Sequence, residues 1–432
     1  MVCRMISHSE LVSASVLIKK NSEINSSLSL QEILAMNIPP YSSLKKHWYI
    51  DDQTVFLNHG SFGACPIPVL QKQDDYRKQM EMQPVKFMVR DLEELIWKSK
   101  ETLAKFVGTA AEDLAFVSNA TTGVNTILNS LEFGENDELL TTNHGYGACV
   151  NALKWFGEKR KAKVIVAEVP FPISSSDEVI NALVSKISSR TKLVMIDYIT
   201  SPTGLLFPVK KIVDACAERG IDCLVDGAHA PGQVPLNIDQ LGTAYFSGTC
   251  HKWICSPKGA GFIHVRKDRQ HLIHPITVSH TYDKTEHKER MWSSNFFWPG
   301  TSDYTSYVCV KDAIEFMGTL FPGGWHELMQ TNRTLCLKAR KTISEKTGLP
   351  LAAPEEMIVN LSAFDLGETD FPVSRFNHIS PLWRKLLNEF NIELPVLPWN
   401  IDQPRLLLRF SAQCYNSIEQ YEYLGEALKK SL

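Results

Sequence analysis

The segment that decides the fold covers residues 221–262 and reads IDCLVDGAHAPGQVPLNIDQLGTAYFSGTCHKWICSPKGAGF. Its first apolar run, Ile221–Val225, ends in Asp226, and a second short run, Ala244–Ser247, leads to Lys252. We expect both runs to be parallel strands, whose carboxyl ends lie at one edge of a sheet, where ligands usually bind. The aspartate and the lysine would then face the same crevice.

An aspartate and a lysine in this arrangement suit pyridoxal phosphate. The lysine amine forms a Schiff base with the cofactor, and the carboxylate keeps the pyridine nitrogen protonated so that the ring accepts electrons. Taken alone, a surface lysine and a loop aspartate are the commoner explanation for such a pair. The rest of the chain has to decide between the two interpretations.

Strand-like and helix-like patterns alternate ahead of this segment. Strands are expected at 114–119, 138–143, 163–169 and 193–199, and the helices between them near 122–131, 147–160, 177–188 and 208–219. This alternation predicts an α/β fold with a doubly wound, mostly parallel sheet. We expect residues 261–266 to add an antiparallel edge strand.

The rhythm changes after about residue 310, where unlike elements follow one another over a shorter stretch. We expect a smaller α+β domain there, with helices at 323–346, 381–390 and 417–430 and strands at 357–366 and 405–412. The predicted organisation is a weakly structured N-terminal arm (1–54), a large domain (55–310) and a small C-terminal domain (311–432). The arm's apolar run, LVSASVLI (11–18), is too short and too polar to cross a bilayer, so the sequence predicts a soluble protein.

Composition narrows the choice of partners and compartment. The chain has 45 basic and 48 acidic residues and a net charge of −3, which gives no reason to expect nucleic acid or an anionic membrane as a partner. Its ten cysteines are scattered, several of them inside apolar runs, which predicts a reducing, cytoplasmic location. The histidines of HLIHPITVSH (271–280) lack a cysteine or carboxylate at ligand spacing, so we expect no metal.

Two strand–helix turns are candidates for holding the cofactor. In SNATTGVN (118–125), Thr121 and Thr122 lie where free backbone N–H groups and the positive end of a helix bind anions. The alternative is a threonine that only caps its own helix. In HGYGACVN (144–151), His144 or Tyr146 would lie flat on a cofactor ring, although such a tyrosine is more often ordinary packing.

The motifs VDGAHAPG, SGTCHKW, SPKGAGF, WPGT and LRFSAQCYN together resemble class V aminotransferase-family pyridoxal phosphate enzymes of fold type I. Within that family the resemblance points to isopenicillin N epimerases and their relatives, which include ergothioneine-pathway C–S lyases and cysteine desulfurases. The resemblance extends from about Val55 to the C-terminus and leaves the N-terminal arm outside.

For the cofactor, the resemblance implies that Lys252 is the Schiff-base lysine and proton shuttle, and that Asp226 is the pyridinium partner. It implies that His229 lies beside the phenolic oxygen of the cofactor. Tyr146 stands at the ring-stacking position, where desulfurases carry histidine. The residues matched to phosphate contacts are Thr121, Thr122, Thr249 and His251.

For the partner subunit and the substrate, the resemblance implies that Thr301 reaches the phosphate of a second subunit in a homodimer. Ser302 follows it where relatives commonly carry arginine. Arg409 matches the arginine that binds the substrate α-carboxylate, for which a two-pronged guanidinium is well suited. From the residues alone, the anion that a buried arginine requires is either that carboxylate or a structural acid such as Asp402. The predicted substrate-entrance residues are Asn58, His59 and Ser61.

These parts predict removal of the Cα proton of an amino-acid substrate, and several outcomes remain open. Return of the proton on the other face gives epimerisation, loss of a β- or γ-group gives C–S lyase chemistry, and proton transfer to the cofactor gives transamination. A persulfide-forming desulfurase is disfavoured because no cysteine lies between Cys336 and Cys414, where a mobile thiol is expected. A catalytically silent binding protein is disfavoured by the intact Lys252, Asp226 and Arg409.

Overall fold

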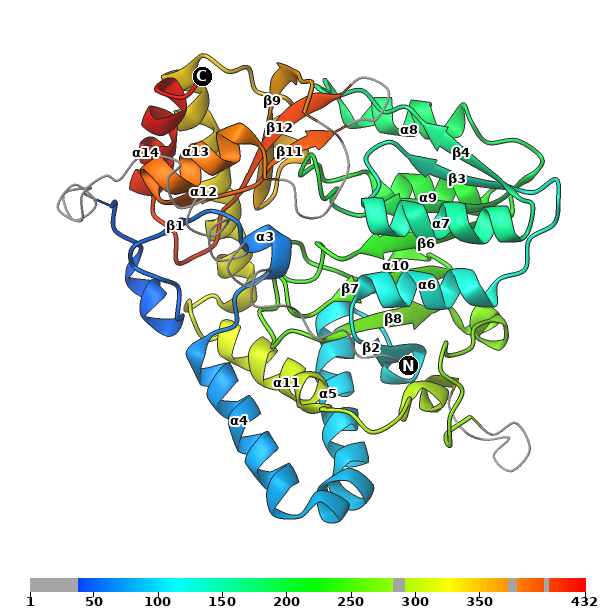
Figure 1. Cartoon of the computed structure of the whole chain (residues 1–432). Helices are drawn as coiled ribbons and strands as arrows, with labels where there is room; N and C mark the ends of the chain where they lie inside the picture. The colour runs from blue at the N-terminus through cyan, green and yellow to red at the C-terminus, as the bar shows by residue number, and fades with distance from the viewer. Residues whose placement is uncertain (1–37, 283–291, 372–378, 400–403) are drawn as a thin grey trace, which may run out of the picture. The chain divides into compact units, whose positions relative to one another are not determined.

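The central element is a seven-stranded sheet in a computed structural model that describes residues 38–282, 292–371, 379–399 and 404–432 (Figure 1). In sheet order the strands are β2 (Leu114–Val117), β8 (Gly261–Val265), β7 (Tyr245–Thr249), β6 (Asp222–Gly227), β5 (Thr191–Asp197), β3 (Glu138–Thr142) and β4 (Lys163–Ala167). All neighbours from β7 to β4 pair in parallel, which confirms the predicted doubly wound, mostly parallel sheet. The prediction of an edge position for β8 is wrong, because this strand lies between β2 and β7 and is antiparallel to both.

Helices connect these strands as the alternating pattern predicts. Apolar side chains of α6 and α7 pack with the strands in one core that includes Val124, Leu153 and Leu224. Gly123 lets α6 approach the sheet closely, because a Cβ atom there would lie 2.2 Å from Ser247 Oγ. The helices of this part are α6 (Ala120–Ser130), α7 (Gly147–Lys159), α8 (Ser176–Val184), α9 (Val209–Ala217) and α10 (Ile238–Leu241).

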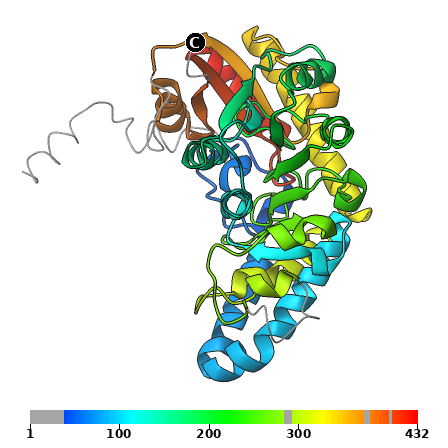
Figure 2. The ribbon, with the colours of Figure 1, turned by 90° about the vertical axis from the view of Figure 1, so that its right-hand side faces the viewer.

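A helical pair, α4 (Ile67–Met82) and α5 (Leu92–Val107), extends below the sheet in Figures 1 and 2. Helix α5 ends at Gly108, whose φ of +70° is the left-handed conformation expected of a glycine stop. Both helices contact α11 (Thr305–Met317). The domain boundary predicted at residue 310 therefore falls inside a helix that packs on the large domain.

The C-terminal part contains a three-stranded antiparallel sheet in the order β11-β12-β9. Two helices of this part, α12 and α14, pack against each other. The short strand β1 (Val55–Phe56) pairs in parallel with β10, so the chain near residue 55 joins the C-terminal part. The remaining elements are β9 (Leu361–Glu368), β10 (Ile392–Glu393), β11 (Val396–Trp399), β12 (Arg405–Ser411), α3 (His59–Phe62), α12 (Gly324–Thr347), α13 (Pro381–Phe390) and α14 (Ile418–Lys429).

The N-terminal segment is ordered earlier than the sequence predicts. A short 3-10 helix covers Ser43–His47, and the buried Trp48 packs in one cluster with Met317 and Tyr415. A weakly structured arm over residues 1–54 is therefore wrong for its last part, because apolar contacts with distant segments hold residues near Trp48. The run LVSASVLI lies outside the described residues. Within the described ranges, no helix is long and apolar enough to cross a membrane.

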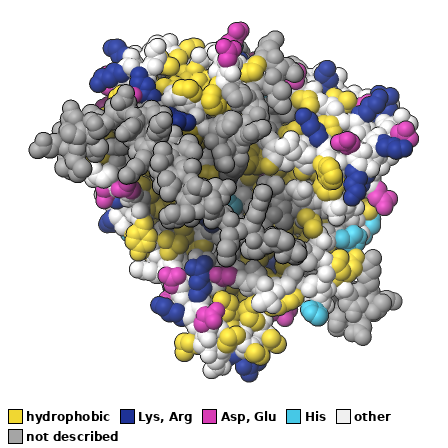
Figure 3. Space-filling model, viewed as in Figure 1, with side chains coloured by type: hydrophobic (Ala, Val, Ile, Leu, Met, Phe, Trp, Pro, Cys, Tyr) yellow, Lys and Arg dark blue, Asp and Glu magenta, His cyan; other side chains and the backbone are white. Residues whose placement is uncertain are grey.

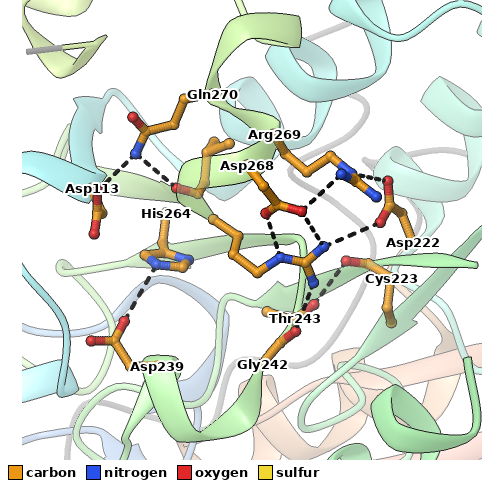
Figure 4. A network of polar contacts seen from close by, with 12 residues as sticks. Asp113, Asp222, Cys223, Asp239, Gly242, Thr243, His264, Asp268, Arg269 and Gln270 are labelled. Carbon is orange, nitrogen blue, oxygen red and sulfur yellow. Dashed lines mark hydrogen bonds and ion pairs between the residues drawn. The ribbon is translucent and has the colours of Figure 1, made fainter. Parts of the chain in front are cut away.

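A polar network at the start of β6 marks the sheet edge opposite Asp226 (Figure 4). Arg269 Nε donates to Asp222 Oδ2 at 2.7 Å, and Arg269 Nη1 donates to Asp268 Oδ2 at 2.8 Å. Arg266 Nε donates to Asp268 Oδ1 at 2.6 Å. On the face shown in Figure 3, cationic and anionic side chains are interspersed over the described residues, in keeping with the balanced composition.

Candidate active site

Three neighbouring strand ends bring polar side chains to one edge of the sheet. Asp226 of β6 pairs in register with Asp197 of β5 on one side and with Ser247 of β7 on the other. Lys252 follows three residues after the end of β7. Parallel pairing therefore brings Asp226 and the lysine loop together, as the opening segment of the sequence predicts.

The amine of Lys252 has a defined partner and a lowered pKa. Its Nζ lies 3.0 Å from His229 Nε2. Burial lowers the pKa of Lys252 to about 8, and the charge of Arg409 acts in the same direction, while Asp226 opposes both. A substantially larger fraction of this amine is thus uncharged near neutral pH than for an exposed lysine.

Residues of α3 and the glycine that follows it contact the backbone around Lys252. His59 Nε2 lies 3.0 Å from the carbonyl oxygen of Lys252. Gly63, with a φ of +70°, contacts the same loop so closely that a Cβ atom would lie 1.9 Å from the carbonyl oxygen of His251. Only glycine fits this close approach to the backbone of the lysine loop.

Asp226 offers a buried acceptor beside the thiol of Cys149, which is only a weak donor. Its side chain is 3% exposed, and Oδ1 accepts a hydrogen bond from the backbone N–H of Ala228 at 3.0 Å. Oδ2 is buried and has no hydrogen-bond partner among the described residues. A buried carboxylate oxygen without a donor is costly. The protonated ring nitrogen of pyridoxal phosphate is the donor that this oxygen requires, so the site fits that cofactor.

Asp197 is a second buried carboxyl group that the sequence reading missed. It is 3% exposed and lies beside Asp226 in the sheet. Burial raises the pKa of Asp197 well above its usual value, and the charge of Asp226 raises it further. The sequence does contain a sign of this residue, because Asp197 ends the apolar run LVMID just before the turn SPTG (201–204), where a strand is expected to end at the ligand-binding edge of the sheet.

Arg409 is a buried guanidinium held by neutral groups. Its Nη2 donates to Ser61 Oγ at 2.8 Å, and its Nη1 donates to Ser201 Oγ at 3.2 Å and to the Ser201 carbonyl oxygen. Burial lowers the pKa of Arg409 to about 10. No carboxylate of the described residues forms an ion pair with it; Asp402, the structural alternative, lies outside those residues. The guanidinium therefore remains available to an anionic ligand.

The three predicted entrance residues have two different roles in the structure. Ser61 Oγ donates to Asn58 Oδ1 at 2.6 Å and accepts from Arg409, so these two residues orient the guanidinium. The substrate-contact role predicted for His59 is wrong. Its ring is fully buried, with Nδ1 2.9 Å from Tyr415 Oη and Nε2 directed at the Lys252 backbone. Burial lowers the pKa of His59 to about 3, so it supports the lysine loop as a neutral ring.

The structure separates the two candidates for the ring-stacking position. Tyr146 is 38% exposed, and its ring centroid lies 6.0 Å from Lys252 Nζ. His144 is buried, with Nδ1 2.7 Å from Thr203 Oγ1 and Nε2 3.1 Å from the Val169 carbonyl oxygen. Tyr146 is thus the aromatic side chain available to a cofactor ring.

At the predicted phosphate turn, Asn119 caps α6 by accepting from the Thr122 backbone N–H at 2.8 Å. The threonine-cap alternative is therefore wrong. Thr122 Oγ1 lies 2.9 Å from Ser118 Oγ, and Thr121 is partly exposed beside it. These positions leave the phosphate role of both threonines as a prediction.

The two phosphate candidates before the lysine are already engaged in part. Thr249 Oγ1 donates to the Ala228 carbonyl oxygen at 2.6 Å, so its proton is already engaged within the protein. His251 Nδ1 lies 3.0 Å from the Ala260 carbonyl oxygen, which leaves Nε2 for a ligand. Thr301 and Ser302 are exposed, and their contact with a second subunit stays a prediction.

The thiols of the described chain are poorly suited to persulfide chemistry. Eight of the nine described cysteines are buried and Cys65 is half-buried. Burial raises the pKa of Cys65 and of Cys414 to about 12. A nucleophilic thiol must be accessible and readily ionised. Within the described ranges, no group of histidine, cysteine and acidic side chains is arranged to hold a metal ion.

Comparisons with known proteins show which family this chain resembles. The family model described as Aminotransferase class-V matches residues 56–370. The chain is 30% identical to isopenicillin N epimerase of Amycolatopsis lactamdurans, covering 90% of this chain and 98% of that protein. It is 29% identical to putative L-cysteine desulfhydrase 1 of Oryza sativa subsp. japonica, covering 87% and 82%. Among solved structures, a cystine C–S lyase in complex with cysteine persulfide has a TM-score of 0.74 at 19% identity, covering 88% of this chain and 98% of that one.

Proposed function

The chain belongs to the class V aminotransferase family of pyridoxal phosphate enzymes, and we propose that it removes the Cα proton of an amino acid or amino-acid derivative and acts as an epimerase. When bound, pyridoxal phosphate supplies an electron sink that makes this proton acidic. The remaining chemistry belongs to the side chains of the site.

One observation carries the proposal: a reactive amine, an unpartnered carboxylate oxygen and a guanidinium without a counter-ion belong to the same site. We assign Lys252 as the covalent anchor of the cofactor and as the base, a role that its lowered pKa favours. Asp226 Oδ2 would accept from the pyridine N–H, and Arg409 would bind the substrate α-carboxylate.

The choice of epimerisation is supported by two features. The epimerase of Amycolatopsis lactamdurans aligns along nearly its whole length at 30% identity, and the family resemblance assigns Tyr146 to the ring position where desulfurases carry histidine. A C–S lyase acting on cysteine derivatives is the second candidate, favoured by the comparable similarity to a putative cysteine desulfhydrase. Transamination requires the same first proton removal and is the third outcome.

A single incubation series tests these alternatives. Amino acids and cysteine conjugates are incubated with the enzyme in D2O, and deuterium at Cα, inversion, pyruvate, sulfide and keto acid are followed together. We expect deuterium at Cα with inversion and without pyruvate or sulfide. Release of pyruvate and sulfide would instead establish a lyase, and keto acid an aminotransferase. Lys252→Ala is the inactive control.

We also propose a cytoplasmic homodimer in which Thr301 approaches the cofactor phosphate of the partner subunit. Unpaired cysteines throughout the described residues support a reducing compartment, and closed dimers are the commonest oligomers. Sedimentation tests the dimer. A mixed dimer of Lys252→Ala and Thr301→Ala chains tests the shared site, because one of its two sites would carry both changes and the other neither.

A further inference from the structure

Trp253, the residue after the proposed anchor lysine, is joined to that lysine through a histidine. Its buried indole donates from Nε1 to His229 Nδ1 at 3.3 Å, and His229 Nε2 lies 3.0 Å from Lys252 Nζ. Gln233 Nε2 donates to the His229 carbonyl oxygen at 2.7 Å and holds the histidine backbone. The three side chains form a short hydrogen-bonded row.

The chemistry of the indole fixes the protons along this row. An indole N–H only donates, so His229 Nδ1 must carry a lone pair. An imidazolium ring has a proton on each nitrogen and therefore does not fit. The ring is thus neutral with its proton on Nε2, and that proton points at Lys252 Nζ. Only the neutral amine has a lone pair to accept it.

We propose that Trp253 is a positioning residue that fixes the tautomer of His229 and thereby favours the neutral, reactive form of Lys252. A charged Lys252 would have to donate to Nε2, which moves the histidine proton to Nδ1 and breaks the bond from Trp253. The indole bond and the ammonium form therefore exclude each other. This inference rests on the proposed function only in taking Lys252 as the reactive amine.

The other groups around Lys252 show why such a device is useful. Asp226 of β6 favours the ammonium form by its charge, whereas Asp197 of β5 and Cys149 of α7 do so only when ionised, and burial raises the pKa of both well above its usual value. The ring of Tyr146 favours the ammonium form as a cation–π partner. Burial and Arg409 of β12 oppose them. The neighbouring rings His59 and His251 are held neutral by their lowered pKa values, about 3 and about 4. An N–H donor at His229 Nε2 shifts the protonation equilibrium of Lys252 further toward the neutral amine.

The test uses the full-length chain, first freed of cofactor so that the amine of Lys252 is unmodified. Long-range 1H–15N correlation of 15N-histidine-labelled protein reads the tautomer of His229, and loss of its signals in His229→Gln assigns it. We expect the Nε2–H tautomer in the unmodified chain. In Trp253→Phe we expect the Nδ1–H tautomer or the imidazolium form to appear.

A second measurement follows Lys252 directly. The rate at which added pyridoxal phosphate becomes covalently attached is followed by absorbance over about pH 6 to 10, which gives an apparent pKa for Lys252. Trp253→Phe should raise that value by about one unit and slow attachment near pH 7 by roughly tenfold. Trp155→Phe, at an exposed tryptophan, is the matched control and should change neither quantity.

The outcomes separate this inference from the function on which it rests. A glutamine amide retains a donor for Lys252 without a tautomer, so Trp253→Phe should have little further effect in a His229→Gln background. An unchanged tautomer and an unchanged apparent pKa in Trp253→Phe would overturn the inference. If that variant does not fold, an Nδ1–H tautomer or imidazolium in the unmodified chain would overturn it as well. Covalent attachment in Lys252→Ala would instead overturn the assignment of the lysine.

Discussion

Replacing Arg409 by lysine tests whether this site binds the carboxylate of an α-amino acid. Arg409 is 4% exposed, and its guanidinium is oriented by Ser61 on one nitrogen and by Ser201 on the other. Lysine keeps the positive charge but has a single terminal nitrogen, so it cannot present two parallel N–H groups to a carboxylate. The loss should therefore fall on substrate binding.

The structure sets the size of the expected effect. A hydrogen bond to a charged group contributes about 1.5 to 3 kcal/mol, and Arg409→Lys removes one prong of a two-pronged contact in a buried site. We expect kcat/KM to fall roughly 10- to 1000-fold, equivalent to about 1.4 to 4 kcal/mol, mainly through a higher KM. The visible absorbance of the bound cofactor should not change, because Arg409 contacts neither Lys252 nor Asp226 by a hydrogen bond.

The assay is deuterium incorporation at Cα of the best substrate found, measured over a range of substrate concentrations. Arg405→Lys is a matched control, because Arg405 lies on the same strand and pairs with Asp365 at 2.7 Å. That variant should keep a normal KM. Full activity of Arg409→Lys, or an equal rise in KM in both variants, would refute the role of Arg409 as a carboxylate clamp.

Three further predictions follow from named contacts. Lys252→Ala should abolish the borohydride-sensitive cofactor band and turnover while circular dichroism stays native, and Lys258→Ala, at an exposed neighbouring lysine, should keep both. Arg269→Ala should lower the free energy of unfolding by roughly 1 kcal/mol, seen in urea titrations, without changing kcat, because the Asp222 network lies at the sheet edge opposite the site. Lowering the pH from about 6.5 to 4 should progressively reduce the free energy of unfolding, because the unfolded chain takes up protons at histidines that the folded chain keeps neutral. In the folded chain, burial lowers the pKa of His59 to about 3 and the pKa values of His144, His251 and His264 to about 4. Urea titrations over this pH window test the prediction, and a free energy of unfolding that does not change with pH would contradict the burial of these rings.

Local patterns in the sequence predict much of the large domain. Alternating apolar strands and helices place Asp226 at a strand end, and parallel pairing then brings it near Lys252. Local patterns do not predict the order of the strands in the sheet, because that order depends on which strands distant in the sequence pair with each other. The antiparallel β8 has a strand pattern that fits an edge or an interior position equally well, and only its neighbours β2 and β7 decide.

The residues that sequence reading missed or misplaced act through contacts between distant segments. The sequence predicts that His59 is a loop residue near the substrate. In the structure its ring nitrogens lie within hydrogen-bond distance of the Tyr415 hydroxyl and the Lys252 carbonyl oxygen, two residues that are distant from it in the sequence. Asp197 becomes informative only once β5 is known to lie beside β6. Only the tertiary structure reveals these two features: the complete burial of His59, and the pairing of Asp197 with Asp226 on neighbouring strands.

Two arginines on β12 differ in their partners, and this difference supports the role proposed for Arg409. Arg405 has a carboxylate partner, Asp365, which satisfies its charge within the chain. Arg409 has neutral oxygen acceptors, which fix the direction of its N–H groups without neutralising the charge. A carboxylate beside Arg409 would compete with the carboxylate of a substrate, whereas serine oxygens orient the guanidinium and leave its charge for the ligand. The serine oxygens compensate part of the desolvation of this guanidinium, and in the proposed role the substrate α-carboxylate would compensate the rest, which would couple its recognition to filling of the site.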